Sequence, residues 1–219
     1  MNSYIWRATN FTRITKNFLL HLFFPVECLI CHEPAEIICG TCLKTLINEN
    51  TKNSQIKDGL KIFSGSNYAG NISKIIKALK YSGHKSLGQP LGKILAMTIA
   101  KPDNLDYLIP VPLHIDSERS FNQSLEIAKG ISKIWNVEIL NAAVWSKIIP
   151  RRVGLNAIER MSLEDDAFAV KNDCDLKNKT AALIDDVCTT GTTLLKLRNV
   201  LEKAGANILS AYTLAGGQS

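Results

Sequence analysis

Residues 181–193, AALIDDVCTTGTT, constrain the fold of this chain more than any other segment. The first four are apolar, as in a strand that is buried on both faces of a parallel sheet. Asp185 and Asp186 follow at the carboxyl end of this strand, and a turn of small and hydroxyl-bearing residues comes next. Apolar residues then recur with helical spacing over 194–204. This order predicts an α/β fold that binds its ligand at the carboxyl ends of parallel strands.

The polar residues of this segment match the chemical groups of a ribose 5-phosphate. Asp185 and Asp186 offer only acceptors at neutral pH, which suits the 2′ and 3′ hydroxyls of a ribose and, with them, a magnesium ion. The turn offers hydroxyls and backbone N–H groups at the start of a helix, where an anion is stabilised. Its members are Thr189, Thr190, Gly191, Thr192 and Thr193. We therefore expect the carboxylates to face the sugar and the turn to hold the 5-phosphate.

An ordinary helix cap is the alternative interpretation of Asp186, because acidic residues and threonines often begin helices in α/β folds. A nucleoside triphosphate loop does not fit. Such a loop carries a lysine after its last glycine, whereas Thr192 follows Gly191 in this chain.

A cysteine cluster near the N-terminus has the pattern C-x2-C-x7-C-x2-C. Its four members are Cys28, Cys31, Cys39 and Cys42. Two such pairs present thiolates in the tetrahedral arrangement that zinc prefers, and four sulfur ligands indicate a structural site. We expect a structural zinc ion, with a pair of disulfides or an iron–sulfur cluster as the alternatives.

The chain has 219 residues, enough for one substantial domain and a small module. Apolar segments predict strands at 107–111, 137–140, 181–184 and 208–213. Helical patterns between them imply a mainly parallel sheet with helices on both faces. We expect an N-terminal apolar and basic segment at 1–24, the four-Cys zinc module at 25–50, a polar linker at 51–59 and the main domain at 60–219.

The N-terminal segment has basic residues before an apolar run at 18–24. It matches a secretory signal poorly, because the run is short, is interrupted by His21 and lacks a small-residue cleavage site. It is also shorter than the ~18 apolar residues that a membrane helix requires. We expect no transmembrane segment and a cytoplasmic location, with contact to the inner face of a membrane as the alternative.

Basic residues supply candidate anion contacts. The net charge of +6 suits phosphate-bearing partners. Apolar residues with helical spacing predict a helix over 72–79, and Lys80 follows at its end. Lysines on such a helix commonly form its solvated face, but the position of Lys80 makes it a candidate phosphate contact.

Five motifs together resemble one known family. ALIDDVCTTGTTL resembles the phosphoribosyl pyrophosphate signature of type I phosphoribosyltransferases. The four-Cys segment, YAGNISKIIKALKYSG, LIPVPLH, RSFNQ and this signature follow one another in the order found in the ComF family of competence-associated proteins. The resemblance covers nearly the whole chain from about residue 25.

The resemblance implies a type I phosphoribosyltransferase-like domain that binds phosphoribosyl pyrophosphate with magnesium. In the family's chemistry an acceptor attacks the anomeric carbon as pyrophosphate leaves. The loop after the strand at 107–111 corresponds to the pyrophosphate loop, and its candidates are Val111, Pro112 and Leu113. Lys80 and Arg119 would face the same group, and Arg119 would neutralise charge on the departing pyrophosphate. Asp185, Asp186 and Arg119 are thus the candidate catalytic residues. A plain strand end is the alternative for IPVPLH.

The family also implies a part in natural transformation, the uptake of single-stranded DNA by bacteria, together with proteins of the competence machinery. The chain departs from the family at Ser120, where glycine is usual, and at Arg152 and Leu163, where glutamine and asparagine are usual. No acceptor pocket is specified, so turnover stays open. The alternatives are a non-catalytic module for single-stranded DNA or ribose phosphates, with a structural zinc site, and a metabolite-sensing regulator.

Overall fold

The computed structural model describes residues 27–34, 37–48, 53–146 and 167–217. The chain divides into two compact units, Met1–Asn48 and Glu49–Ser219. The first contains helix α2 (Gly40–Asn48) and the cysteine cluster. The predicted N-terminal segment at 1–24 and the departures at Arg152 and Leu163 lie outside the described residues.

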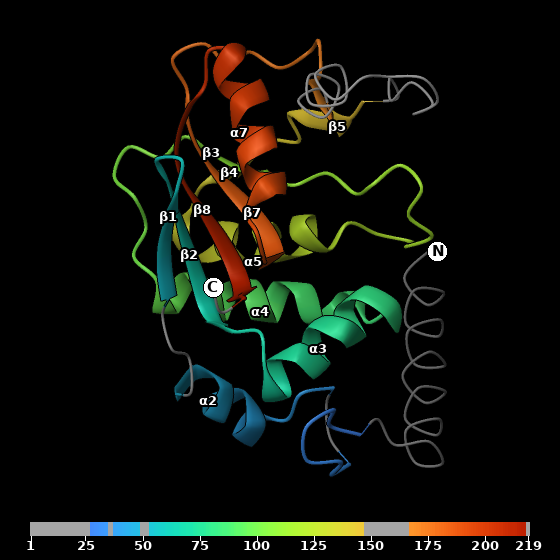
Figure 1. Ribbon diagram of the computed structural model, residues 1–219. Helices are drawn as coiled ribbons and strands as arrows, with labels where there is room; N and C mark the ends of the chain where they lie inside the picture. The colour runs from blue at the N-terminus through green and yellow to red at the C-terminus, as the bar shows by residue number, and fades with distance from the viewer. Residues whose placement is uncertain (1–26, 35–36, 49–52, 147–166, 218–219) are drawn as a thin grey trace, which may run out of the picture. The chain divides into compact units, whose positions relative to one another are not determined.

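The second unit contains a mainly parallel sheet of six strands in the order β1-β2-β8-β7-β3-β4. Only the pair β1–β2 is antiparallel, and each other neighbouring pair is parallel. The strands are β1 (Asn53–Lys57), β2 (Leu60–Asn67), β3 (Tyr107–Pro110), β4 (Glu138–Ile139), β7 (Thr180–Cys188) and β8 (Asn207–Gly216). The prediction of an α/β fold with a mainly parallel sheet is therefore confirmed (Figure 1).

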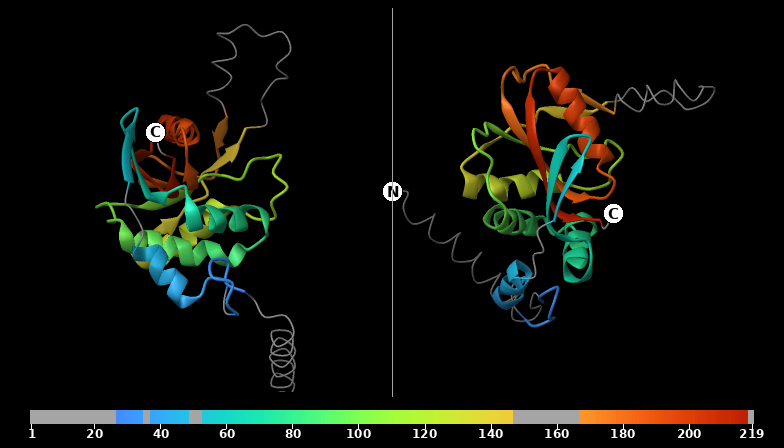
Figure 2. Two further views of the ribbon diagram at one scale, coloured as in Figure 1. Left: turned by 60° about the horizontal axis from the view of Figure 1, so that its bottom comes forward. Right: turned by 60° about the vertical axis from the view of Figure 1, so that its left-hand side comes forward.

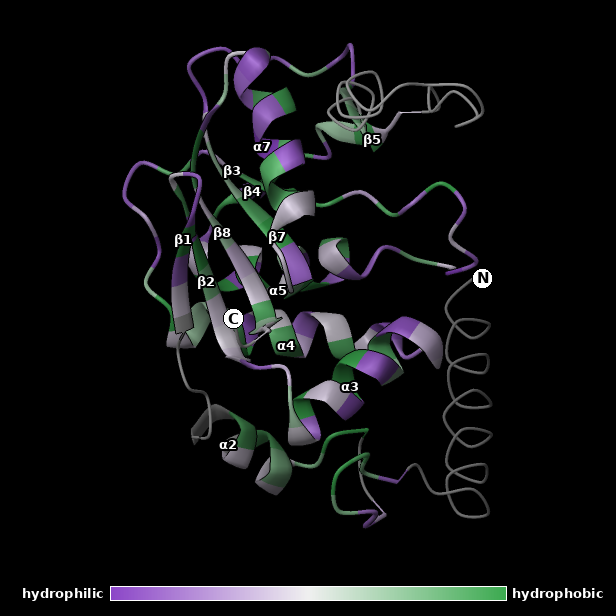
Figure 3. Cartoon of the chain, in the orientation of Figure 1, coloured by the Kyte–Doolittle hydropathy of each residue, from purple (hydrophilic) through white to green (hydrophobic). Residues whose placement is uncertain are grey.

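Helices cover both faces of the sheet. Helix α7 (Thr192–Lys203) contacts β7 and β8 from one side, whereas α5 (Gln123–Trp135) contacts β3 and β7 from the other (Figure 2). Side chains alternate accordingly along the buried strands: Leu183 belongs to the same apolar cluster as Leu197 of α7, while Tyr212 of β8 meets Trp135 of α5 edge to face. The apolar residues of these helices thus face the sheet, and hydrophilic residues lie on the outer side of α7 (Figure 3).

Helix α4 (Gly88–Thr98) packs directly against α5, because glycines remove the side chains between them. A Cβ on Gly92 would lie 2.0 Å from the carbonyl oxygen of Ile127, and one on Gly130 would lie 2.1 Å from that of Gln89. The helix predicted over 72–79 is α3 (Gly70–Tyr81), with Lys80 in its last turn. In the view of Figure 1, α3 and α4 lie below the arrowheads of β7 and β8, and α5 contacts both β3 and β7.

Strand β7 is longer than the apolar run predicts. It continues through Asp185 and Asp186 to Cys188, because β8 remains paired with it. Asp185 is in register with Thr213, and Cys188 with Gly216. The two carboxylates therefore lie within the last part of the strand rather than after it, and backbone hydrogen bonds fix their positions.

The structure differs from the prediction of a linker at 51–59. Residues 53–57 form β1, which turns into β2 at Asp58 and Gly59. Both turn residues have positive φ, 45° and 78°, and an Asp-Gly pair favours the tight turn of a hairpin. The Asp58-Gly59 dipeptide could have predicted this hairpin, but the polar composition of the segment favoured a linker.

A separate two-stranded antiparallel sheet joins β5 (Ala143–Trp145) to β6 (Phe168–Val170). Residues 147–166, which connect these two strands along the sequence, are outside the described residues. Among the helices that the structure describes, none is long and apolar enough to cross a membrane.

Candidate functional site

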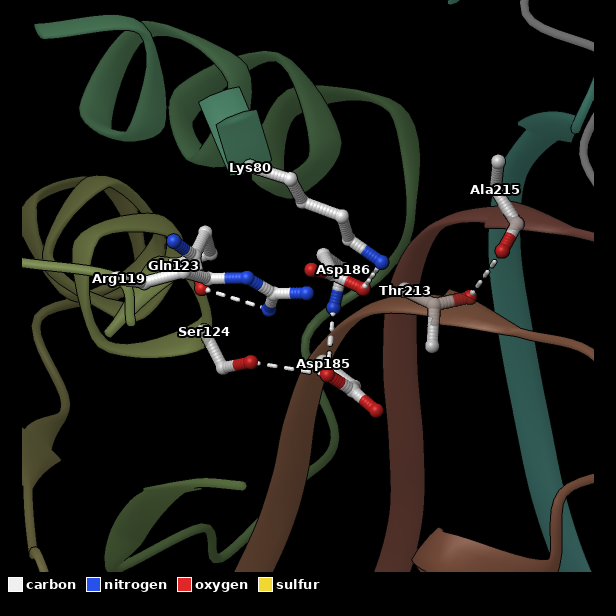
Figure 4. A network of polar contacts seen from close by, with 8 residues as sticks. All are labelled: Lys80, Arg119, Gln123, Ser124, Asp185, Asp186, Thr213 and Ala215. Atoms are coloured by element: carbon white, nitrogen blue, oxygen red, sulfur yellow. Dashed lines mark hydrogen bonds and ion pairs between the residues drawn. The ribbon is translucent and has the colours of Figure 1, made fainter. Parts of the chain in front are cut away.

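Asp185 and Asp186 form the centre of the candidate site, at the carboxyl end of β7 (Figure 4). Ser124 of α5 donates its hydroxyl to Asp185 Oδ1 at 2.9 Å, and the backbone N–H of Asp186 donates to the same oxygen at 2.8 Å. Lys80 Nζ lies 2.8 Å from Asp186 Oδ1. Three elements, α3, α5 and β7, therefore meet at the carboxylate pair.

Burial and the neighbouring charge of Asp186 raise the pKa of Asp185 from 3.8 to about 7. Ser124 and Lys80 act in the opposite direction, but they do not compensate for the loss of water around this carboxyl. The Asp185 carboxyl is therefore about half protonated near neutral pH.

We expect the Asp185→Asn variant to be increasingly more stable than the parent protein as the pH rises from 4 to 8. The unfolded carboxyl ionises near pH 4 and the folded one near pH 7, so the parent protein loses stability between these values. Asparagine carries no charge and retains an oxygen that accepts from Ser124. The difference in unfolding free energy should change by on the order of 4 kcal/mol between pH 4 and pH 8, measured by urea denaturation without magnesium.

The exposed Asp103 provides the control, because Asp103→Asn should produce no such trend. A stability difference for Asp185→Asn that is the same at pH 4 and pH 8 would contradict this assignment.

The predicted phosphate turn lies between β7 and α7. Thr189 and Thr190 are exposed, Gly191 has φ of 79°, and the helix begins at Thr192. The hydroxyls of Thr190 and Thr192 lie 2.9 Å apart. The backbone N–H of Thr192 donates to the Thr190 hydroxyl at 3.4 Å. The other backbone N–H groups in the first turn of an α-helix have no partner within the helix, which suits an anion.

Lys57 contacts this turn, and the sequence analysis did not predict that contact. It ends β1, and its ammonium donates to the carbonyl oxygens of Thr189 at 3.2 Å and Thr190 at 2.7 Å. A Cβ on Gly191 would lie 2.8 Å from Cδ of Lys57, so the lysine side chain passes where only glycine leaves room. The contact spans more than 130 positions and depends on the order of strands in the sheet.

A cavity of about 430 Å³ includes in its lining Lys80, the residue that contacts Asp186. Lys80, Tyr81 and Gly83 line one side, and residues 117–121 line the other. The guanidinium carbon of Arg119 lies 5.4 Å from the centre of the Tyr81 ring, and Nη1 donates to Gln123 Oε1 at 3.2 Å. The two predicted pyrophosphate contacts, Lys80 and Arg119, thus line one cavity.

Gln123, which contacts Arg119 of the cavity wall, is itself buried. Its Oε1 accepts from Arg119, whereas its Nε2 has no hydrogen-bond partner in the described part of the chain. Gln123 belongs to the motif RSFNQ, but the motif alone did not predict that the Gln123 side chain accepts a hydrogen bond from Arg119. Ser120, which stands where glycine is usual in the family, lies in the cavity wall.

The loop of IPVPLH begins beside the carboxylate pair, because Pro110 of β3 is in register with Ile184 of β7. The backbone N–H of Val111 donates to Ile184, and its carbonyl accepts from the side chain of Asn122 at 2.9 Å. Pro112 accepts from Trp145 Nε1 at 2.8 Å. The backbone of Val111 is thus occupied at both polar groups, so Pro112 and Leu113 continue the loop from a fixed end.

The four cysteines in the first unit lie close enough to hold a metal ion together. Their sulfur atoms are all within 4.8 Å of one another. A tetrahedral zinc site with bonds of about 2.3 Å requires sulfur atoms roughly 3.8 Å apart, and Cys31 and Cys39 are separated by 3.7 Å.

Backbone N–H groups support this cluster. Cys39 donates to the sulfur of Cys28 at 3.4 Å, and Cys42 donates to that of Cys39 at 3.5 Å. Burial, followed by the neighbouring cysteines, raises the pKa of the Cys42 thiol to about 12. A divalent metal would offset this, since it stabilises thiolates. The donor set therefore fits a metal ion with four sulfur ligands.

Comparison with known proteins gives similarities over most of the chain. No family model matches it. Competence protein F of Haemophilus influenzae is 26% identical over 189 residues, which cover 81% of this chain and 77% of that protein. Competence protein ComFC of Streptococcus pneumoniae is 24% identical over 187 residues, which cover 80% of this chain and 79% of that protein.

Two solved structures illustrate the structural similarities. Glutamine phosphoribosylpyrophosphate amidotransferase of B. subtilis has a TM-score of 0.45 at 19% identity, covering 59% of this chain and 26% of that chain. Adenine phosphoribosyltransferase of Thermoanaerobacter pseudethanolicus has a TM-score of 0.42 at 13% identity, covering 80% of this chain and 87% of that chain. The resemblance that the motifs predict, to competence proteins of the ComF type, is confirmed by two similarities that each span about four fifths of the chain.

Proposed function

We propose that this protein binds phosphoribosyl pyrophosphate at the carboxyl end of β7 and acts in natural competence. The observation that carries the proposal is the arrangement around Asp186: a carboxylate pair, a cavity with two cations and a helix-start turn follow one another at one end of the sheet. Phosphoribosyl pyrophosphate carries ribose hydroxyls, a pyrophosphate and a 5-phosphate, and these three groups suit the three environments respectively. The two competence proteins that resemble the chain support the cellular role.

Each part of the site has a defined task in this proposal. Asp185 and Asp186 accept hydrogen bonds from the ribose hydroxyls. Residues 189–193 donate to the 5-phosphate, and Lys80 and Arg119 stabilise the negative charge of pyrophosphate, with Pro112 and Leu113 beside it. Magnesium, when bound by the carboxylates and the ligand, supplies further positive charge. Transfer requires no covalent nucleophile, so position and electrostatic stabilisation supply the rate enhancement.

Calorimetric titration with phosphoribosyl pyrophosphate in the presence of magnesium tests this proposal directly. We expect saturable binding to one site per chain, and competition by ribose 5-phosphate. A titration without heat, repeated by ligand-protection of thermal unfolding without any shift, would refute it. Release of pyrophosphate with a panel of nucleobases and amines then decides whether the bound ligand is turned over.

We expect Lys57→Ala to weaken ribose 5-phosphate binding by about tenfold, because the lysine places a positive charge at the turn and holds two of its carbonyl groups. Ribose without phosphate should bind with unchanged affinity. Lys57→Arg should restore most of the loss, since arginine can donate to the same carbonyls.

Lys61→Ala is the matched control for this lysine, because Lys61 lies in the same hairpin and contacts the Phe63 ring rather than the turn. Equal losses for Lys57→Ala and Lys61→Ala would show a general charge effect and remove the assigned role.

The net charge of +6 favours a second candidate, a binding module for single-stranded DNA that works without turnover. Its structural metal is zinc held by the four cysteines in both proposals. Salt-sensitive binding of an oligonucleotide, combined with no pyrophosphate release for any acceptor, would select this candidate over the transferase.

A further inference from the structure

The positive charge of Lys80 can stabilise either the Asp186 carboxylate or an anion in the cavity. Its ammonium is 2.8 Å from Asp186 Oδ1, and the same side chain lines the cavity that contains Arg119. The side chain of Asp186 is only 9% exposed and that of Lys80 is 19% exposed, so the lysine covers one of the carboxylate oxygens (Figure 4). An oxygen engaged by an ammonium is a poorer acceptor for a ribose hydroxyl.

The surroundings of Lys80 allow its side chain to move while the backbone stays in place. Ile75, Ile76 and Leu79 are buried and anchor α3, whereas Lys80 lies in the last turn of this helix. The side chain has four methylene groups, and its ammonium can turn from the carboxylate toward the cavity by rotation about these bonds. Local side-chain torsions are therefore sufficient.

Arg119 cannot make the same exchange without losing its supports. It donates to the buried Gln123, and its guanidinium lies over Tyr81. It therefore serves as a fixed cation of the cavity. Glu118, which also lines the cavity, is exposed to solvent, so it opposes an anion only weakly.

We propose that Lys80 makes the site selective for ligands that carry pyrophosphate. In the free protein the ammonium of Lys80 forms an ion pair with Asp186. A pyrophosphate group in the cavity attracts this ammonium away from Asp186, so the carboxylate becomes available to the ribose hydroxyls. A ribose 5-phosphate without pyrophosphate must instead compete with Lys80. This inference rests on the proposed function of the same site.

Movement of Lys80 from Asp186 to pyrophosphate predicts a coupling between the two ligands that is opposite in sign to simple electrostatic repulsion. Two anions bound side by side repel each other, so each should weaken the affinity for the other. If pyrophosphate removes Lys80 from Asp186, it instead strengthens the binding of ribose 5-phosphate, and by reciprocity ribose 5-phosphate strengthens the binding of pyrophosphate. Positive coupling that is lost in Lys80→Gln is thus diagnostic, because magnesium shared by the two ligands would still couple them in that variant.

The test is calorimetric titration of the full chain with ribose 5-phosphate at pH 8.5 and constant magnesium, with and without saturating pyrophosphate. We expect pyrophosphate to increase the affinity of the parent protein about fivefold. Lys80→Gln should bind ribose 5-phosphate about threefold more tightly than the parent protein when pyrophosphate is absent, should show no gain when it is present, and should bind pyrophosphate about tenfold more weakly.

Lys77→Gln is the matched control, because Lys77 is exposed on the same helix and the variant has the same net charge. It should behave as the parent protein does. If Lys80→Gln fails to fold, the coupling measured on the parent protein still decides the matter, since independent or competitive binding of the two anions overturns the inference.

The outcomes also separate this inference from the proposed function. Binding of both ligands by the parent protein without positive coupling refutes only the selective role of Lys80. Weaker binding of both ligands by Lys80→Gln does the same, because it assigns the lysine a plain charge contact. A parent protein that binds neither ligand refutes the proposed function and this inference together.

Discussion

Replacing Asp185 and Asp186 with asparagine together should reduce the affinity for ribose 5-phosphate at least a hundredfold. The carboxylates offer only acceptors, whereas each asparagine adds an amide donor that opposes a ribose hydroxyl or a magnesium ion. Loss of two charge-assisted hydrogen bonds corresponds to about 3 kcal/mol or more. Calorimetric titration with ribose 5-phosphate and with phosphoribosyl pyrophosphate measures both losses.

The matched control replaces Asp103 and Asp116, which are exposed, and so changes the net charge by the same amount. Asp103→Asn with Asp116→Asn should bind both ligands as the parent protein does. Unchanged affinity in the Asp185→Asn and Asp186→Asn double variant would show that the ribose binds elsewhere. The two aspartates would then have only a structural role in the strand and the helix cap.

Removing the metal from the four-cysteine cluster should unfold the first unit while the second unit stays folded. A module of this size buries too little apolar surface to fold by itself, and binding of structural zinc is worth on the order of 10 kcal/mol. We expect one zinc ion per chain by elemental analysis, and none in Cys39→Ser. Hydrogen exchange should then show loss of protection over 27–48 and retained protection in β3, β7 and β8.

Cys174→Ser provides the control, because this half-buried thiol lies outside the cluster. It should keep the full zinc content. Iron with a visible absorption band, or two disulfides in the mass spectrum of the untreated protein, would replace zinc with one of the other two interpretations of the cysteine pattern.

The candidate site combines features that local sequence predicts with contacts that it does not. Residues 181–193 predict strand, carboxylates, turn and helix because each signal depends on neighbours a few positions apart. The end of β7 was harder to predict. Its polar residues suggest an end after Ile184, but pairing with β8 extends the strand to Cys188.

Partners of the site residues come from distant parts of the chain. Ser124 reaches Asp185 across 61 positions, and Lys57 reaches Thr190 across 133. Nothing in the residue types of Ser124 or Lys57 distinguishes them from the many surface serines and lysines of a soluble domain. Lys57 even lies in a segment whose polar composition predicts a linker.

The sequence by itself determined the α/β class, the cysteine cluster and the carboxylate and threonine groups of the site, because periodicity, ligand spacing and side-chain chemistry are local properties. Only the tertiary structure decided that Lys80 lies on Asp186 beside the cavity of Arg119, and that Lys57 holds the turn. These contacts depend on the order of strands and on the close packing of α4 and α5, which arise from the burial of apolar surface across the whole unit.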